Sequence, residues 1–227
     1  YLLFPLQIYF DFSGYIDMAL GASIFLGIKL PINFNKPYLT GSLTSFWRSW
    51  HITLSNWFRD YLYIPMGGSR LSKNRLYFNL IITMTIAGLW HGASFNFVLW
   101  GFLNGLFLCF EKIYNINNKN SLFRIIINCF LIFNLWLVFR INEIDNLINY
   151  FFIIYSNLFD IFTLQNMAIL LFVAMSIYSQ KFDNYLTIEK ISLTVNFSML
   201  IPFFLILLVT GLGISTGQSD KFIYFDF

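Results

Sequence analysis

The segment LYFNLIITMTIAGLWHGASFNFVLWGFLNGLFLCF, residues 76–110, contains no Lys, Arg, Asp or Glu. A helix needs about 20 predominantly apolar residues to cross a bilayer. At about 1.5 Å per residue, this segment is too long for one straight span. Gly88 and Gly92 interrupt it on either side of His91, and glycine is a common interruption of a helical pattern. The segment therefore predicts two membrane helices with a break at His91.

Basic residues flank this predicted helix pair on both sides. Arg70, Lys73 and Arg75 precede it, and Lys112, Lys119 and Arg124 follow it. Lys and Arg are enriched in cytoplasmic loops, so both ends of the pair are expected in the cytoplasm. His91 would then lie at the deep end of a hairpin.

Further apolar segments extend the same pattern along the chain. Of the 227 residues, 58% are hydrophobic and 11% are charged, whereas about a quarter of the residues of a soluble domain are charged. Further spans are predicted at Tyr1–Ile28, Leu122–Phe139, Ile161–Gln180 and Ile191–Gly213, with a weaker helix at Glu143–Leu158. These features predict an all-α, polytopic transmembrane bundle that forms one membrane domain, residues 1–227, in a lipid bilayer.

Several functional classes lose support from the composition and the motifs. The net charge of +3 comes from scattered residues, and no block of positive charge exists that would follow a nucleic acid backbone. Cys109 and Cys129 lie in apolar segments without a CxxC or a nearby His, so they are predicted to be small buried hydrophobic residues, and no metal site is expected. The sequence has no GxSxG, P-loop, HExxH or EF-hand pattern, which argues against serine hydrolases, nucleotide-driven pumps and zinc proteases.

The first predicted span carries polar residues on one stripe. Ser13, Asp17 and Gly21 recur every four residues, so this stripe is expected to face other helices rather than lipid. Asp11 and Asp17 could form a proton or cation path, or Asp17 could be a structural acid hydrogen-bonded to a neighbouring helix. Pro31 and Pro37 then predict a loop, because proline cannot continue a helix.

Residues Thr44–Tyr61 follow an amphipathic pattern. At about 100° per residue, Trp47, Trp50, Leu54, Trp57, Phe58 and Tyr61 share one face, and Arg48, Ser55 and Arg59 share another. This pattern predicts one helix at the membrane interface, with its tryptophans forming an interfacial belt.

Two histidines are candidates for chemistry. His91 lies in a charge-free segment, and an ionisable residue at membrane depth is a functional-site hypothesis by default. Its unperturbed pKa of about 6.5 suits a general base; the alternative is a neutral histidine that hydrogen-bonds between helices. His51 lies at the border of the aromatic and arginine faces and could look into a polar passage, or it could be an interfacial histidine among tryptophans.

Arg48 and Arg59 are candidates for binding an anionic group. A guanidinium offers paired donors that match a phosphate, such as that of a cofactor. Contact with lipid headgroups is the alternative interpretation of the same two side chains.

Two long blocks give the chain a family resemblance. PINFNKPYLTGSLTSFWRSWHITLSNWFRDYLYIPMGGSR, from Pro31, and TIAGLWHGASFNFVLWGFLNG, from Thr85, resemble the membrane-bound O-acyltransferase family. Within it, the chain is similar to the bacterial alginate and peptidoglycan O-acetyltransferase branch. The likeness also includes QIYFDFSGYIDMALG near the start, FRINEIDN at residues 139–146 and FIYFDF at the end.

The resemblance implies a ring of helices around a tunnel in the bacterial cytoplasmic membrane. It implies an acyl donor such as acetyl-CoA as a substrate, with no tightly bound cofactor, and as partners a periplasmic or extracellular relay protein and a glycan acceptor. His91 matches the catalytic histidine of the family and His51 its second, supporting histidine. Family members are commonly about twice as long, so the chain is expected to be the C-terminal part of a longer protein.

Two function hypotheses follow. The first is an enzyme that moves acetyl groups to hydroxyls of an extracytoplasmic polysaccharide, with His91 as base and His51, Arg48 and Arg59 near the donor entrance. The second is a proton-coupled transporter or channel in which Asp11, Asp17 and His91 form a proton path. Acyl transfer by purified protein would distinguish the two.

Overall fold

The computed structural model describes residues 2–116, 121–141, 144–156 and 163–181. These ranges lie within one compact unit, Tyr1–Lys181, and their regular elements are all helical. The predicted span Ile191–Gly213 lies outside the described residues. The assignment of residues 1–227 to one domain therefore stays a prediction.

Helix α1, Phe4–Phe25, confirms the helix predicted at Tyr1–Ile28. Pro5 lies in its first turn, where the missing N–H costs nothing because the first amides of a helix have no partner within it. Gly27 follows the end of the helix with a φ of 72°, and the N–H of Ile28 donates to the carbonyl of Ser23 at 2.8 Å. Glycine adopts this left-handed conformation without a steric penalty, so it sets the start of the loop.

The predicted loop between Pro31 and Pro37 is confirmed, and the 3-10 helix η1, Pro37–Leu39, follows it. Tyr38 is fully buried and ties this segment to the rest of the unit. Its hydroxyl donates to the carbonyl of Pro5 at 2.6 Å, and its backbone N–H donates to Oε1 of Gln180 at 3.1 Å. The segment is thereby joined to α1 and to the end of α8, Leu164–Ser179.

The prediction of one continuous helix over Thr44–Tyr61 is wrong. The structure has α2, Leu43–Trp47, then α3, Ile52–Phe58, and then the π-helical turn η2, Arg59–Tyr63. The break lies at His51, whose backbone is left-handed with φ 42° and ψ 56°. Such a conformation costs about 1–3 kcal/mol in a residue other than glycine, so contacts elsewhere must impose it.

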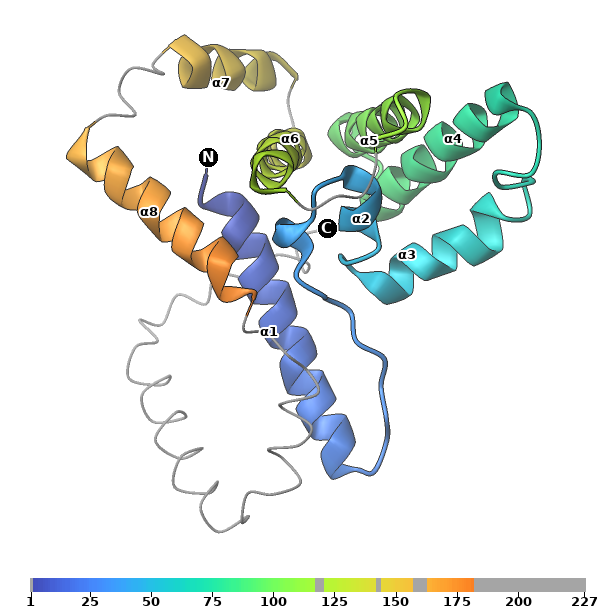
Figure 1. The fold of residues 1–227 in the computed structure, drawn as a ribbon, viewed down its shortest axis with the longest axis horizontal. Coiled ribbons are helices and arrows are strands. Elements are labelled where there is room, and N and C mark those ends of the chain that lie inside the picture. The colour runs from blue at the N-terminus through green and yellow to red at the C-terminus, as the bar shows by residue number, and fades with distance from the viewer. Residues whose placement is uncertain (1, 117–120, 142–143, 157–162, 182–227) are drawn as a thin grey trace. The chain divides into compact units, whose positions relative to one another are not determined.

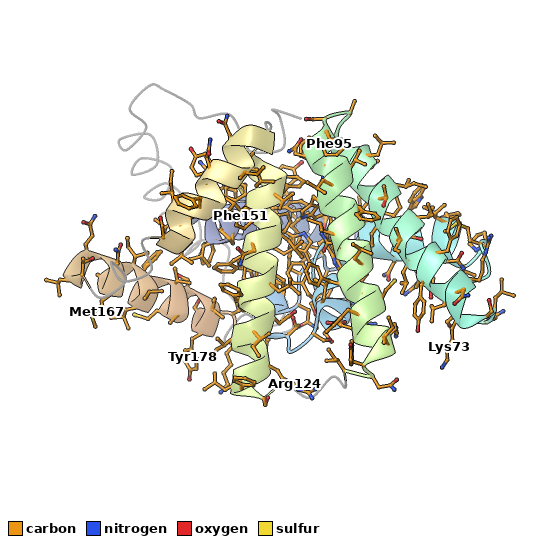
Figure 2. The ribbon with its side chains drawn as sticks, turned by 90° about the horizontal axis from the view of Figure 1, so that it is seen from above. Lys73, Phe95, Arg124, Phe151, Met167 and Tyr178 are labelled. Carbon is orange, nitrogen blue, oxygen red and sulfur yellow. The ribbon has the colours of Figure 1, made fainter. Side chains whose placement is uncertain are left out.

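The predicted helix pair with a break at His91 is confirmed. Helices α4, Lys73–His91, and α5, Phe95–Ile113, pack side by side as a hairpin (Figure 1). Figure 2 shows Lys73 and Phe95 at opposite ends of this hairpin, so His91 lies at its tip.

Glycines set the close approach of α4 and α5. A Cβ on Gly88 would lie 2.1 Å from the carbonyl oxygen of Phe97. One on Gly105 would lie 2.6 Å from the Cα of Ile81. Small residues at such positions let two helix backbones come into direct contact.

Helix α6, Leu122–Arg140, confirms the span predicted at Leu122–Phe139 and forms much of the core. Among the described helices, it alone is long and apolar enough to cross a membrane; α8 is apolar but shorter. Helix α7, Ile144–Ser156, corresponds to the predicted weaker helix. Cys109 and Cys129 are buried free thiols, as predicted.

Candidate active site

His91 is the last residue of α4 and lies against aromatic rings of α5 and α6. Its ring meets the ring of Trp100 edge-on at a centroid distance of 5.5 Å and that of Phe139 at 5.1 Å. A Cβ on Gly92 would lie 2.8 Å from the ring of Phe97, so a glycine after His91 lets Phe97 pack beside the hairpin tip. The imidazole is thus held on several sides by carbon surfaces.

A buried aromatic cluster separates the surroundings of His91 from those of His51. Its rings come from the loop after α1 and from α2, α5 and α6, together with the residue before His51: Phe34, Phe46, Trp50, Trp100, Trp136 and Phe139. Trp50 lies 5.1 Å from Trp136, which stacks on Trp100 at 5.7 Å. Aromatic contacts of this kind add stability beyond the area that they bury, so they hold the hairpin tip and the α2–α3 break in one body.

The prediction that Trp47, Trp50 and Trp57 form one interfacial belt is wrong for Trp50. Its side chain is 2% exposed, whereas that of Trp57 is 52% exposed. Trp47 is part-buried and donates from Nε1 to Oδ1 of Asn104 on α5 at 3.2 Å. The break at His51 turns α2 away from the helical register of α3, and this rotation separates the three rings.

His51 occupies the N-cap of α3 but does not cap that helix with its own side chain. Its ring meets Phe12 of α1 edge-on at 4.8 Å. Its Nδ1 lies 3.2 Å from Oδ1 of Asn33. Burial lowers the pKa of His51 to about 4, so the imidazole is neutral at pH 7.

Asn33 caps α3 in place of His51. Its backbone carbonyl accepts the N–H of Ile52 at 3.0 Å. Its Oδ1 accepts the N–H of Thr53 at 3.1 Å and the hydroxyl of Thr53 at 2.7 Å. Asn33 therefore takes the first amides of α3, which have no partner within the helix.

The rings of the buried aromatic cluster link the surroundings of the two predicted histidines. His91 contacts Trp100, and Trp100 stacks on Trp136. Trp136 lies against Trp50, the residue before His51. The two imidazoles, far apart in the sequence, therefore lie along one aromatic cluster.

The two predicted arginines do not share a helical face, because the break at His51 lies between them. Arg48 is exposed and follows α2 directly. Arg59 begins η2 and forms a two-bond ion pair with Asp60, with Nε–Oδ1 at 2.7 Å and Nη2–Oδ2 at 3.0 Å. Exposed ion pairs are weak, so an incoming phosphate could replace Asp60.

Asp11 and Asp17 are both exposed on α1. The described residues contain no group of three or more His, Cys, Asp or Glu side chains that could hold a metal ion. A cavity of about 660 Å³ lies between α5 and α6, with a mainly aromatic and aliphatic lining to which Glu111 and Arg124 also contribute. Neither histidine lines this cavity, so it is separate from the histidine site.

Neither Asn33 nor the rings that contact His91 were predicted from the sequence as parts of the site. The signal for Asn33 was its place between Pro31 and Pro37, where an Asn is a common partner for nearby backbone amides. The signal for Trp100 and Phe139 was weaker, since an aromatic residue in an apolar helix is expected for packing alone.

The chain belongs to the membrane-bound O-acyltransferase family, whose model matches residues 1–144. The family is named for membrane-bound transfer of acyl groups to oxygen. This membership supports the enzyme hypothesis over the transporter or channel.

Several bacterial proteins are similar to the chain, and their names refer to alginate, peptidoglycan or teichoic acid. The chain is 46% identical over 142 residues to the probable alginate O-acetylase AlgI of Pseudomonas syringae pv. tomato, covering 61% of this chain and 27% of that protein. It is 43% identical over 151 residues to the peptidoglycan O-acetyltransferase of Helicobacter pylori, covering 64% and 29%. It is 35% identical over 127 residues to the teichoic acid D-alanyltransferase of Bacillus subtilis, covering 51% and 31%. The aligned regions span less than a third of these relatives.

Proposed function

We propose that the protein is a multi-pass enzyme of the bacterial cytoplasmic membrane that transfers acetyl groups from a cytoplasmic donor toward hydroxyls of an extracytoplasmic polysaccharide. The observation that carries the proposal is the aromatic cluster that joins the surroundings of His91 and His51 in a chain that belongs to an O-acyltransferase family. The names of the relatives support acetyl transfer to a glycan. Acetyl-CoA is the proposed donor.

His91 is the proposed general base. The acceptor hydroxyl loses its proton to the imidazole while its oxygen attacks the thioester carbonyl of the donor. The C–S bond then breaks, and the imidazolium returns the proton to the departing thiolate, so that protons and electrons balance. The aromatic walls around His91 exclude water that would otherwise hydrolyse the thioester.

His51 is proposed to support the donor, and Arg48 and Arg59 to bind its phosphates at the cytoplasmic entrance. Both arginines are exposed, and guanidinium groups suit phosphate oxygens. A periplasmic or extracellular relay protein and a glycan acceptor are the proposed partners.

Acetyl transfer by the purified full-length enzyme, with its partner protein present, tests this proposal. Replacing His91 by Gln should lower the rate per folded molecule by about a hundredfold to ten-thousandfold, the usual loss of a general base. Glutamine keeps a similar size and hydrogen bonding but cannot accept the proton. Residual activity above about a tenth of the wild-type rate, less than that range allows, would show that His91 is not the base. The melting temperature of the variant provides the control for folding.

A further inference from the structure

We propose that Asn33 is a positioning residue that holds His51 in the tautomer with its proton on Nδ1, so that His51 presents Nε2 to the substrate as a hydrogen-bond acceptor. This inference rests on the proposed function, because it assigns His51 a place in the transferase site. It deepens that function by naming the kind of substrate group that His51 can meet.

The hydrogen bonds of Asn33 fix the identity of its amide atoms. The N–H of Thr53 can only donate, and it lies 3.1 Å from the side chain of Asn33. The atom that it meets must therefore be the amide oxygen and not the nitrogen. The hydroxyl of Thr53, at 2.7 Å from the same oxygen, donates to it as well.

The same oxygen fixes the proton of His51. Oδ1 of Asn33 lies 3.2 Å from Nδ1 of His51, and an amide oxygen can only accept. If Nδ1 carried a lone pair, two acceptors would face each other. The proton therefore lies on Nδ1, and because the ring is neutral at pH 7, Nε2 carries the lone pair.

The backbone position of His51 explains why a second residue, Asn33, caps α3. A polar side chain at an N-cap usually accepts an amide of its own helix, and an imidazole used in this way would lose its acceptor nitrogen. His51 occupies the N-cap of α3 in a left-handed conformation without making that bond. Asn33 caps α3 from another part of the chain, which leaves the ring of His51 for a ligand.

The assignment predicts the chemistry of the group that His51 binds. A lone pair on Nε2 pairs with an N–H or O–H, so it matches a hydroxyl of the acceptor or an amide N–H in the pantetheine arm of a coenzyme A thioester. It does not match a carbonyl or phosphate oxygen, because those groups need a donor.

Nitrogen NMR of the full-length enzyme labelled at histidine tests the inference, with the signals of His51 identified as those missing from the His51→Gln variant. In the wild type, Nδ1 should show a directly bonded proton and Nε2 should not. A proton on Nε2 instead would overturn the inference, whether or not the enzyme transfers acetyl groups.

Asn33→Asp tests the positioning role without removing the cap, since a carboxylate accepts the same amides. The ring of His51 contacts the side chain of Asn33 and the ring of Phe12, and its titratable neighbour across the aromatic cluster is His91. A carboxylate beside Nδ1 should raise the pKa of His51 by about one to three units. The pH titration of the His51 nitrogen signals should move to higher pH by a similar amount.

The matched control is Asn35→Asp, which adds the same charge two residues away on an exposed side chain. It should shift the pKa of His51 much less, because solvent screens the new charge. Equal shifts in the two variants, or no shift in Asn33→Asp, would show that Asn33 only caps α3. If the wild-type enzyme transferred no acetyl groups, that result would count against the proposed function and leave the tautomer assignment intact.

Discussion

A Cβ added to Gly101 would lie 2.2 Å from the carbonyl oxygen of Met84. The backbone of α5 at Gly101 therefore lies directly against the backbone of α4, in the hairpin that carries His91. Real Cβ atoms do not approach backbone oxygens this closely, so the two helices can pack at this distance only because residue 101 has no side chain.

Gly101→Ala should therefore destabilise the hairpin. Forcing extra atoms into a packed interior typically costs about 1–3 kcal/mol, and here the neighbour is backbone, which cannot rotate away. The melting temperature of the detergent-solubilised enzyme measures the effect. Phe102→Leu is the matched control, because Phe102 is the next residue and is 41% exposed; its melting temperature should stay near that of the wild type.

Replacing Glu111 by Gln should destabilise the first turn of α2. The carboxylate of Glu111 accepts the N–H and the hydroxyl of Thr44 at 2.9 and 2.6 Å and also binds the N–H of Leu43. In Glu111→Gln, one oxygen is replaced by an amide donor that cannot accept these groups, and losing a cap typically costs about 1 kcal/mol. Hydrogen exchange at the amides of Leu43 and Thr44 should become faster.

Lys112, the exposed residue next to Glu111, supplies a control for the hydrogen-exchange experiment. Lys112→Gln also changes one charge at the end of α5, but Lys112 takes no part in the capping of α2. Exchange at the same two amides should then be unchanged. Similar protection in both variants would mean that Ser42, the N-cap of α2, is sufficient without Glu111.

His51→Gln should be a milder lesion than His91→Gln. If His51 supports donor binding, its loss should first appear as a raised apparent KM for acetyl-CoA, with kcat less affected. Steady-state kinetics with varied donor concentration provide the measurement. A fall in kcat as large as that of His91→Gln, with an unchanged KM, would give His51 a part in the chemical step instead.

The two basic ends of the hairpin should lie on the same, cytoplasmic side of the membrane. Cysteines placed at Ser72 and Asn115 should react with a membrane-impermeant thiol reagent from that side, because both positions are exposed and flank the hairpin. The native Cys109 and Cys129 are buried and give the background signal. Labelling of the two positions from opposite sides would contradict the positive-inside assignment.

Much of the helical layout was predictable because it depends on local sequence. The break between α4 and α5 follows from Gly92, which ends α4 in a segment without charges, and the loop before η1 follows from Pro31 and Pro37. The end of α1 at Gly27 has a similarly local cause. In each case, the residue type itself limits the backbone or the length of a helix.

The site was less predictable because its parts are distant in the chain. The periodicity of Thr44–Tyr61 is that of one amphipathic helix, and nothing within those residues indicates the left-handed backbone of His51. The amide oxygen and carbonyl of Asn33 accept the amides of Ile52 and Thr53, and these partners come from another segment. The rings around Trp50 likewise come from several helices.

The sequence by itself therefore determined an apolar, helical chain with His91 at the tip of a hairpin, since hydrophobicity, glycine and proline act on neighbouring residues. Only the tertiary structure decided where the second helix breaks, which tautomer His51 adopts and how closely α4 and α5 approach. Those features depend on hydrogen bonds and van der Waals contacts between segments far apart in the chain, and such contacts exist only once the chain has folded.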